Sequence, residues 1–527
     1  MAKIKSEYKL PNPLVYRLSN PNYTIYHRAA LGGLASTIKA WGDNQPQGIT
    51  AQARRDEVVL SWDDEKLTDQ DFLRILIENS FKLDVETKLI DLPGQRIGAN
   101  RDDLRLAVHN GITATFLQHP KMRLGEKGSR KTELKTADEE SGSFISYKAI
   151  DSFAHQKAQK TGLLDEKLKG NLPEVAAIQQ WIVPGVAGGA DELFMPTEEV
   201  ILLLFLMVGS VVFHLRPRTF KEKAQACLIV PDVIDLTAFA KAVSYINAQN
   251  KDFERFSNSY LGRVVGGAEE AALRFLLDLQ ADNLIHKERK SVNGCYVIAM
   301  GKVAWDKNQV NRSIIARVRG DYEEINIFIA ARQYLGKSKV IKTEKGDSFV
   351  IPSSPIPELV AANLAAERHW CFGFKTLVSE KKDFERMFYS IGGLRKMKDE
   401  IKDFDDRAVI DVFHEAWKFT MRNLYDRAES RNSNESTDLD SRRERIRNEV
   451  LRAKTADALS SWFLRFCADA TKGGSLPAMR KNGERIRKFI FNPRNFERFQ
   501  NLCLFALVSY AGKETATANQ LQTQGEN

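Results

Sequence analysis

A short segment near the middle of the chain gathers residue types that suit contacts with nucleic acid. It runs from Met300 to Ser313 and places a tryptophan, three amides and several cations between two predicted strands. Asn and Gln can pair with base edges, Arg and Lys reach guanine or phosphate, and Trp stacks on bases or wedges between them. The alternative is an ordinary loop whose tryptophan folds back on the sheet. The candidate base-contacting residues are Lys302, Trp305, Lys307, Asn308, Gln309, Asn311 and Arg312.

A second cluster joins aromatic and basic residues directly before a predicted helix. It lies in the sequence from Tyr23 to Ala35, which also carries a Gly-Gly pair on one helical turn. Small residues let another backbone approach closely, while tyrosine and arginine can stack on a base or hold a phosphate. A packing corner between a strand and a helix explains the same pattern as well. The candidate residues for contact with RNA or another subunit are Tyr23, Tyr26, His27 and Arg28.

The positive charge of the chain is concentrated near its C-terminal end. The stretch Ser441–Gln500 holds fifteen Lys or Arg and six Asp or Glu, and this excess equals the net charge of +9 of all 527 residues. A basic helical surface suits a phosphate backbone, because neutralised phosphates release condensed counterions. The alternative is a solvated helix face with salt bridges. The candidate residues for a nucleic-acid strand are Arg442, Arg445, Arg452, Arg480, Lys481, Arg485, Arg487 and Lys488.

A third basic segment lies in the N-terminal part, at residues 118–140. It holds two glycines and little apolar content, so it predicts a long and mobile basic loop, and loops of this length are usually functional or disordered. The candidate phosphate-contacting residues are Lys121, Arg123, Lys127, Arg130 and Lys131.

No catalytic or metal-binding signature stands out in the chain. There is no phosphate-binding loop motif, no zinc-protease motif and no nucleophile elbow, and the eight histidines are scattered. Pro231-Asp232 resembles the start of a nuclease motif, but no acid-x-lysine follows it. The five cysteines lie far apart without a C-x-x-C pair, which argues against a disulfide framework and a zinc site. The sequence therefore predicts a protein that is not an enzyme and has no metal or cofactor.

The elements that position the N-terminal candidates alternate between strands and helices. A strand is expected at Glu57–Trp62, and a capping box at Thr68–Asp71 opens a helix that ends near Phe81. A further strand, helix and strand are expected at Lys88–Leu92, Asp102–Leu117 and Ser143–Ile150.

The central part continues this mixed pattern. The longest apolar run, Val200–Phe213, predicts a buried helix that is too short to span a bilayer. A strand at Gln225–Val230 and two further helices follow it. The last part of the region is rich in predicted strands, which are Tyr296–Met300, Ser313–Val318, Ile325–Ala330 and the two strands of a hairpin at 340–351.

After about Lys381 the strand patterns vanish and long stretches with a period of 3.6 residues predict a helical bundle. The fold class is therefore α+β, with a mixed α/β N-terminal and central region followed by an all-α C-terminal bundle. The expected division is an N-terminal α+β region at 1–170, a central α+β region at 171–380 with a β-rich patch at 294–352, a helical bundle at 381–511 and a disordered tail at 512–527.

The bulk composition is that of a globular protein in a reducing compartment. Hydrophobic residues make up 43% of the chain, and Lys and Arg number 78 against 69 Asp and Glu. The charged N-terminus lacks the apolar core of a signal peptide. We therefore expect a cytoplasmic protein with no contact to a membrane.

Three segments of the chain resemble the large subunit of type I CRISPR surveillance complexes (Cascade), in the branch linked to type I-B and Myxococcus-type loci. They are YTIYHRAALGGLAS near the N-terminus, GKVAWDKNQVNRS in the middle and NLAAERHWCFGF before the helical end. The resemblance covers most of the chain in order and length. It implies a subunit that reads the short protospacer-adjacent motif (PAM) in duplex DNA, while guide pairing reads the rest of the target.

The resemblance also implies partners and roles for the candidate residues. The partners are crRNA, target double-stranded DNA, the backbone, 5′-handle-binding and small subunits, and a recruited helicase-nuclease or transposition protein. The central segment becomes the candidate for PAM contact, the basic loop a clamp on the duplex, and the C-terminal cations a path for one strand of the R-loop. Relatives often show two adjacent glutamines where this chain has Asn308-Gln309, so the preferred PAM stays open.

Two other interpretations stay open at this point. A generic RNA-binding scaffold protein predicts tight RNA binding without preference for a DNA motif, and a nuclease with an unrecognised site predicts metal-dependent cleavage. The C-terminal bundle resembles a small-subunit fold that some relatives also make separately by internal initiation. Met387 and Met397 lie just before the bundle and are the candidate start codons for such a fragment.

Overall fold

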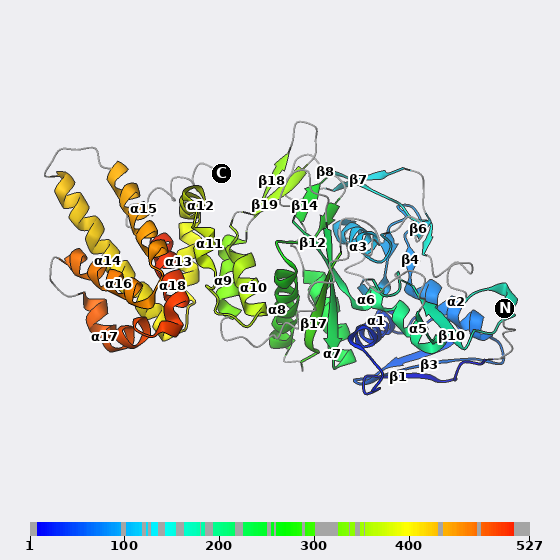
Figure 1. The fold of residues 1–527 in the computed structure, drawn as a ribbon. Coiled ribbons are helices and arrows are strands. Elements are labelled where there is room, and N and C mark those ends of the chain that lie inside the picture. Colours follow the sequence, from blue (N-terminus) through cyan, green and yellow to red (C-terminus); the bar gives the residue numbers. More distant parts are fainter. Residues whose placement is uncertain are drawn as a thin grey trace. The chain divides into compact units, whose positions relative to one another are not determined.

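The chain divides into two compact units. Unit 1 comprises Met1–Gly320 and Val340–Ile351, and unit 2 comprises Asp321–Lys339 and Pro352–Asn527. Their elements are labelled in Figure 1. The computed structural model describes residues 8–95, 102–118, 123–124, 128–134, 143–153, 163–179, 181–184, 193–216, 225–249, 254–257, 260–286, 290–300, 325–336, 338–342, 348–352, 354–429, 436–471 and 476–510.

The helix α1, Ile25–Trp41, lies at the centre of unit 1 and is buried over most of its surface. It contacts the helices α5 (Thr197–Leu204), α6 (Leu206–Gly209) and α7 (Leu236–Gln249). Its Gly-Gly pair permits this packing, because a side chain at Gly33 would clash with the backbone of α6. The glycines therefore serve a close contact within the chain.

A three-stranded antiparallel sheet has the order β1-β3-β2, formed by Leu14–Arg17, Glu57–Trp62 and Ile49–Ala53. Buried and half-buried residues alternate along β3, as expected for a strand with one face against a core. The strand β3 and the helix α2, Asp69–Ser80, confirm the expected elements. The capping box is also present, since Thr68 and Asp71 exchange hydrogen bonds at the start of α2.

A four-stranded sheet with the order β16-β12-β13-β17 forms the second framework of unit 1. β13 (Gln225–Val233) pairs antiparallel with β12 (Val211–Leu215) and β17 (Val292–Ala299), and β16 (Val264–Val265) runs parallel to β12. The helices α1 and α8 (Ala268–His286) both contact β13.

The sequence predicted one buried helix for the apolar run at Val200–Phe213. In the structure this run does not form a single helix. Its first part lies in α5 and α6, and its last residues begin the strand β12. The Gly209-Ser210 pair ends the helical part, with Ser210 in an extended conformation. Two β-branched valines follow, and such residues favour a strand that pairs with β13.

Shorter elements complete unit 1. The helix α3, Asp102–Ala114, agrees with the expected helix, and the expected hairpin at 340–351 is present. The strand pairs outside the two larger sheets are β4–β5 (Lys82–Leu83, Ile90–Asp91), β6–β9 (Arg123–Leu124, Ser152–Phe153), β7–β8 (Arg130–Leu134, Ser143–Tyr147), β10–β11 (Val175–Ile178, Leu193–Pro196), β14–β15 (Glu254–Ser257, Tyr260–Gly262) and β18–β19 (Ser338–Lys342, Ser348–Pro352).

Unit 2 is built mainly of helices in the residues that the structure describes. Its helix α18 is buried from Phe499 to Ser509, and α11, α13, α14 and α15 pack against it. The helices are α9 (Ile325–Leu335), α10 (Ile356–Ala365), α11 (Phe374–Leu377), α12 (Lys381–Met387), α13 (Ile391–Asp399), α14 (Phe404–Glu429), α15 (Ser436–Arg452), α16 (Ala456–Thr471), α17 (Pro477–Ile490) and α18 (Phe496–Ser509).

The strand expected at Ile325–Ala330 is wrong, because this segment begins the helix α9. Apolar residues alternate in its sequence, which resembles a strand, but burial continues at helical spacing through Phe328, Ala331 and Leu335. Its neighbours in space are α10 and α13. Residues that were expected in the central region therefore pack with the C-terminal helices, and the division by compactness falls earlier than residue 380.

The predicted fold class is confirmed, since a mixed α/β part precedes an all-helical part. None of the helices in the described ranges combines the length and the apolar character that crossing a lipid bilayer requires. The tail at 512–527 lies outside the described residues.

Candidate nucleic-acid interface

The predicted base-contacting segment follows the strand β17 directly. Met300 is buried at the end of this strand and donates its backbone N–H to Ala226 O at 2.7 Å. The four-stranded sheet thus fixes the point from which the segment departs. The candidate residues themselves lie outside the described residues, and they are Lys302, Trp305, Lys307, Asn308, Gln309, Asn311 and Arg312.

The basic segment at 118–140 contains strands where the sequence predicted a loop. Arg123 lies in β6, which pairs with β9, and Arg130 and Lys131 open β7, which pairs antiparallel with β8. Lys131 is exposed, whereas Arg130 donates a hydrogen bond to the main-chain oxygen of Glu86. The other two candidates, Lys121 and Lys127, lie outside the described residues.

The N-terminal aromatic-basic cluster holds the start of α1 in place. His27 is 3% exposed, stacks on Tyr23 with ring centroids 5.0 Å apart, and accepts a hydrogen bond from Thr24 N at 3.2 Å. Its Nε2 lies 3.5 Å from Glu199 Oε2. Burial, with Arg28 nearby, lowers the pKa of His27 to about 4 and keeps the ring neutral near pH 7. These contacts favour the packing-corner interpretation for Tyr23 and His27.

Arg28 joins the same corner to the larger sheet. Its Nε donates to Asp232 Oδ1 at 2.6 Å, and its Nη1 donates to Tyr23 O at 3.1 Å. Asp232, which resembles part of a nuclease motif in the sequence, is therefore half of an ion pair. Tyr26 and Arg28 keep partial exposure, so contact with RNA or another subunit stays a prediction for these two residues.

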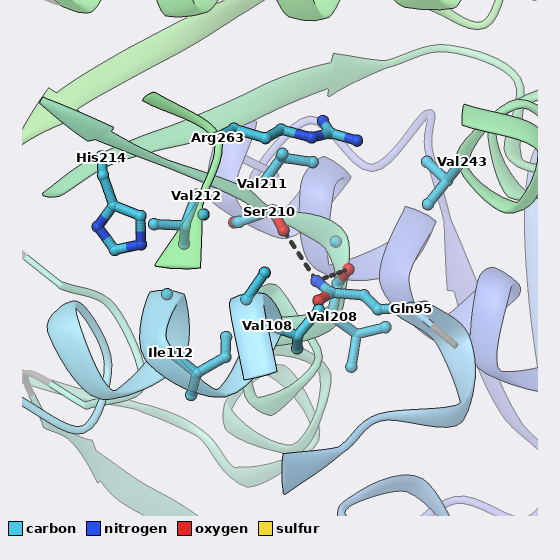
Figure 2. A pocket seen from close by; sticks show the side chains of 14 residues that line it. Gln95, Val108, Ile112, Val208, Ser210, Val211, Val212, His214, Val243 and Arg263 are labelled. Atoms are coloured by element: carbon cyan, nitrogen blue, oxygen red, sulfur yellow. Dashed lines mark hydrogen bonds between the residues drawn. The ribbon is translucent and has the colours of Figure 1, made fainter. Parts of the chain in front are cut away.

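A small pocket lies between α3, β12 and α7 in unit 1. Figure 2 shows Val108 and Ile112 of α3 on one side, Val211 and Val212 of β12 on the other, and Gln95 between them. The Gln95 amide donates to main-chain oxygens of the α6–β12 turn, including that of Val208 at 2.7 Å.

His214 and Arg263, two polar residues that line this pocket, have structural roles beside the four-stranded sheet. Burial lowers the pKa of His214 to about 4, and the Arg263 guanidinium lies 5.6 Å from the centroid of the Phe213 ring. Among the described lining residues there is neither a thiol nor a carboxylate. In the described part of the chain, no three His, Cys, Asp or Glu side chains lie close enough to hold a metal ion.

The helix α17 presents a strongly basic face in unit 2. Its buried residues are Ile486, Phe489 and Ile490, and all five of its cations are exposed beside a single acid, Glu484. This helix was not predicted as a separate element, although its basic residues were. Of the predicted strand-contacting residues, Arg442 is half-buried, and the exposed ones are Arg445, Arg452, Arg480, Lys481, Arg485, Arg487 and Lys488.

Part of the positive charge of α15 is used inside unit 2. The guanidinium of Arg443 lies 4.8 Å from the centroid of the Phe388 ring, and that of Arg447 lies 5.1 Å from that of Phe384. Arg445 pairs with Glu449 at 2.9 Å. The solvated-face interpretation therefore fits Arg445, while Arg443 and Arg447 pack on aromatic rings and α17 keeps its cations at the surface.

The segment NLAAERHWCFGF, Asn363–Phe374, contributes to a buried polar cluster in unit 2. We call this cluster the hub, and it consists of His369, Trp370, Cys371, Asp403, Asp406 and Arg498. Asp406, in the first turn of α14, is 0% exposed and accepts hydrogen bonds from Trp370 Nε1 at 2.8 Å and Arg498 Nε at 2.9 Å. His369 Nε2 lies 2.9 Å from the same carboxylate. Arg498 also reaches Asp403 Oδ2 at 2.8 Å. The hub thereby links this segment to both α14 and α18.

The hub contains a Cys-His-Asp row of the kind that thiol enzymes use. Cys371 Sγ lies 3.1 Å from His369 Nδ1, and His369 in turn contacts Asp406. Nucleophilic catalysis needs a thiol that a substrate can reach, but Cys371 is 0% exposed. The row is therefore a packing feature of the helical unit.

Comparison with known proteins agrees with this architecture. The model of the DevT N-terminal domain matches residues 15–204, and that of the DevT C-terminal domain matches residues 397–527. A protein of Myxococcus xanthus (strain DK1622), described as CRISPR-associated protein Cas8a1/Csx13, is 26% identical over 555 positions. These positions cover 97% of this chain and 91% of that protein.

The two domain models match the chain in order, and the second covers the helices from α14 to α18, where the exposed cations lie. The similarity to the Myxococcus protein extends over nearly the full length of both chains. The resemblance inferred from three sequence segments is confirmed: the chain is similar to DevT domains in its N-terminal and C-terminal parts and, over nearly its full length, to a CRISPR-associated protein described as Cas8a1/Csx13.

Proposed function

We propose that this chain is the non-catalytic large subunit of a crRNA-guided type I Cascade complex, and that it reads the PAM and supports R-loop formation. Support comes from the family and from one observation above all, the exposed basic face of α17 in a unit with an otherwise well-packed core. Phosphate contacts of this kind position a strand without reading its sequence.

Sequence reading is assigned to the segment 301–313, which departs from the end of β17. Its amides would contact base edges in the major or minor groove, and Trp305 would wedge beside the first base pairs of the target. The framework before it is rigid, because β17 pairs with β13 along most of its length.

The division of labour follows from the chemistry. A few amide contacts at the PAM and local destabilisation of the duplex start the exchange of strands, and guide pairing then reads the target. The basic face of α17 would hold one strand of the open duplex. Bond cleavage or insertion would be left to a recruited helicase-nuclease or transposition protein.

The test is reconstitution of the guide complex with variants of the amide pair. The chain is expressed with its neighbouring genes and a guide RNA, and the complex is bound to duplexes with randomised flanking motifs. Loss of motif preference in Asn308→Ala/Gln309→Ala is the expected result. The matched control is Asn44→Ala/Gln47→Ala, which removes two exposed amides after α1.

Three results would contradict parts of the proposal. A preference that survives in the amide double variant places the PAM reader elsewhere, for which the basic segment is the next candidate. Tight binding of RNA with no preference among DNA motifs favours a generic RNA-binding scaffold. A chain that never joins the guide complex contradicts the role in Cascade.

A further inference from the structure

We propose that the hollow beside Phe404 and Arg485 receives one base of single-stranded DNA, with Phe404 as the stacking residue. This inference rests on the proposed function, in which a DNA strand follows the helical unit. It adds a contact with a base to a surface that otherwise offers only charge. The sequence predicted strand contacts for Arg485 and Lys488 but not for Phe404, which has no distinguishing neighbours in the sequence.

Phe404 is an exposed aromatic residue with a cation against its ring. It is the first residue of α14 and is 70% exposed, although a large apolar ring gains free energy by leaving water. The guanidinium carbon of Arg485 lies 5.3 Å from the ring centroid, and Arg485 Nη1 lies 3.3 Å from Asp405 Oδ1. The ring is thus supported by a cation that is itself anchored.

Such a supported ring suits a nucleobase. Bases stack on aromatic side chains and on guanidinium planes in proteins that bind single strands without sequence preference. A cation over one part of the ring also orders it, so less side-chain entropy is lost when a base stacks on it. Phe404 itself does not line the hollow, but Arg485, which contacts its ring, and Asp405, its neighbour in the chain, both do.

The hollow next to the ring has the character of a base-binding site. It measures about 760 Å³ and is open to solvent. Two acids in it are balanced by cations, since Glu484 lies 2.7 Å from Lys488 and Asp405 contacts Arg485. The residues that line it are Asp405, Glu484, Arg485, Lys488, Phe489, Asn492 and Asn495.

This balance of charge indicates which part of a nucleotide fits. A phosphate would meet two carboxylates in the hollow, whereas a neutral base can accept from amides and donate a ring N–H or amino group to carboxylates. The phosphates would instead follow the cations outside the hollow, which include Arg480, Lys481 and Arg487. Phe491, which precedes Asn492 in the chain, is a second exposed aromatic residue of this part of unit 2, at 50% exposure.

The experiment measures binding of a fluorescein-labelled oligodeoxythymidine of about 12 nucleotides to the full chain, by anisotropy, at several salt concentrations. We expect Phe404→Ala to weaken binding by about 5- to 140-fold while the dependence on salt stays unchanged. Phe404→Trp keeps a stacking ring and should bind like the wild type. The control is Tyr389→Ala, which removes an aromatic residue that is 92% exposed and lies outside α14 and α17.

A strand with abasic positions supplies the second arm. Both the wild type and Phe404→Ala should bind it with the same weak affinity, because the base that stacks is absent. A strand that carries 5-iododeoxyuridine should crosslink to Phe404 on irradiation. An oligouridine is compared in parallel, and dependence on Phe404 for RNA but not for DNA overturns the assignment to DNA.

The outcomes separate this inference from the proposed function. A wild-type chain that binds no single strand contradicts both. A wild type that binds, together with a Phe404→Ala variant that binds equally well, overturns the stacking site alone. A variant that keeps its affinity for DNA but no longer co-purifies with the guide complex shows that a protein occupies the hollow, which also overturns the inference.

Discussion

Replacing the buried carboxylate of Asp406 tests the structural reasoning most directly. Asp406→Asn keeps the shape of the side chain but removes its charge, and one of its two oxygens becomes a donor. Arg498 then keeps only Asp403 as an acidic partner, and the amide hydrogens face donors from His369 and Trp370. Breaking a buried ion pair on one side costs about 3–5 kcal/mol, because the other charge stays buried.

That cost has a measurable consequence in hydrogen exchange. A free-energy loss of this size raises the population of the open state roughly 140- to 3,700-fold. The backbone amides of α14 and α18 should exchange faster by this factor under native conditions, where exchange follows the opening equilibrium. Mass spectrometry of peptides from the two helices measures the change.

The matched control is Asp411→Asn on the same helix. Asp411 pairs with Lys398 at 3.1 Å and is 46% exposed, so its loss should cost at most about 1 kcal/mol. If both variants exchange alike, the hub does not stabilise the helical unit and the argument from buried hydrogen bonds is refuted. Unchanged exchange in Asp406→Asn refutes it equally.

Three further perturbations follow from other contacts. Gly33→Ala should lower the free energy of unfolding by about 1–3 kcal/mol or more, because the new methyl group meets the main chain at Phe205; denaturant melts measure this, and no loss would contradict the close packing of α1 and α6. Arg480→Ala/Lys481→Ala should reduce the salt dependence of single-strand binding by a slope of about 1.4, as read from titrations at several salt concentrations, if both cations meet phosphates. Burial, together with Lys398, lowers the pKa of His414 to about 4, below its ordinary value of about 6.5. The unfolded chain therefore binds the proton more readily, so stability should fall as pH drops from about 6.5 to about 4, and thermal melts of a His414→Gln variant should show a weaker fall in this window.

The sequence predicted the elements whose signals are local. The capping box of Thr68 and Asp71 and the alternating strand Glu57–Trp62 specify their own structure, and both are present. The strand predicted at 325–330 is wrong, because its apolar residues fit both the period of 2 of a strand and the period of 3.6 of a helix. Contact with α10 and α13 decides in favour of the helix. The run Val200–Phe213 forms part helix and part strand for a similar reason, since its last valines pair with the strand β13.

The candidate site was predicted less completely than the fold. Clustering of charge identified the cations of α17, which lie at the surface, but it could not show that Arg443 and Arg447 stack on aromatic rings. The sequence indicated the hub only through a family-like segment, because Asp406 and Arg498 lie in helices that are far apart in the sequence. Nothing in the local pattern marks Phe404, since its exposure depends on how α14 and α17 pack.

The contact between Gly33 and Gly209 has a consequence for how the chain is made. The helix α1 is buried on nearly all sides, yet the turn that covers it belongs to α6, roughly 170 residues later in the chain. At about 5–20 residues per second, translation needs on the order of 10–30 s to supply that turn after α1 has formed. During this interval the apolar surface of α1 stays exposed on the ribosome, because α6 has not yet been synthesised. Biosynthesis of unit 1 should therefore depend on chaperones that shield α1, and slowing translation between the two glycines should lower the yield of soluble protein.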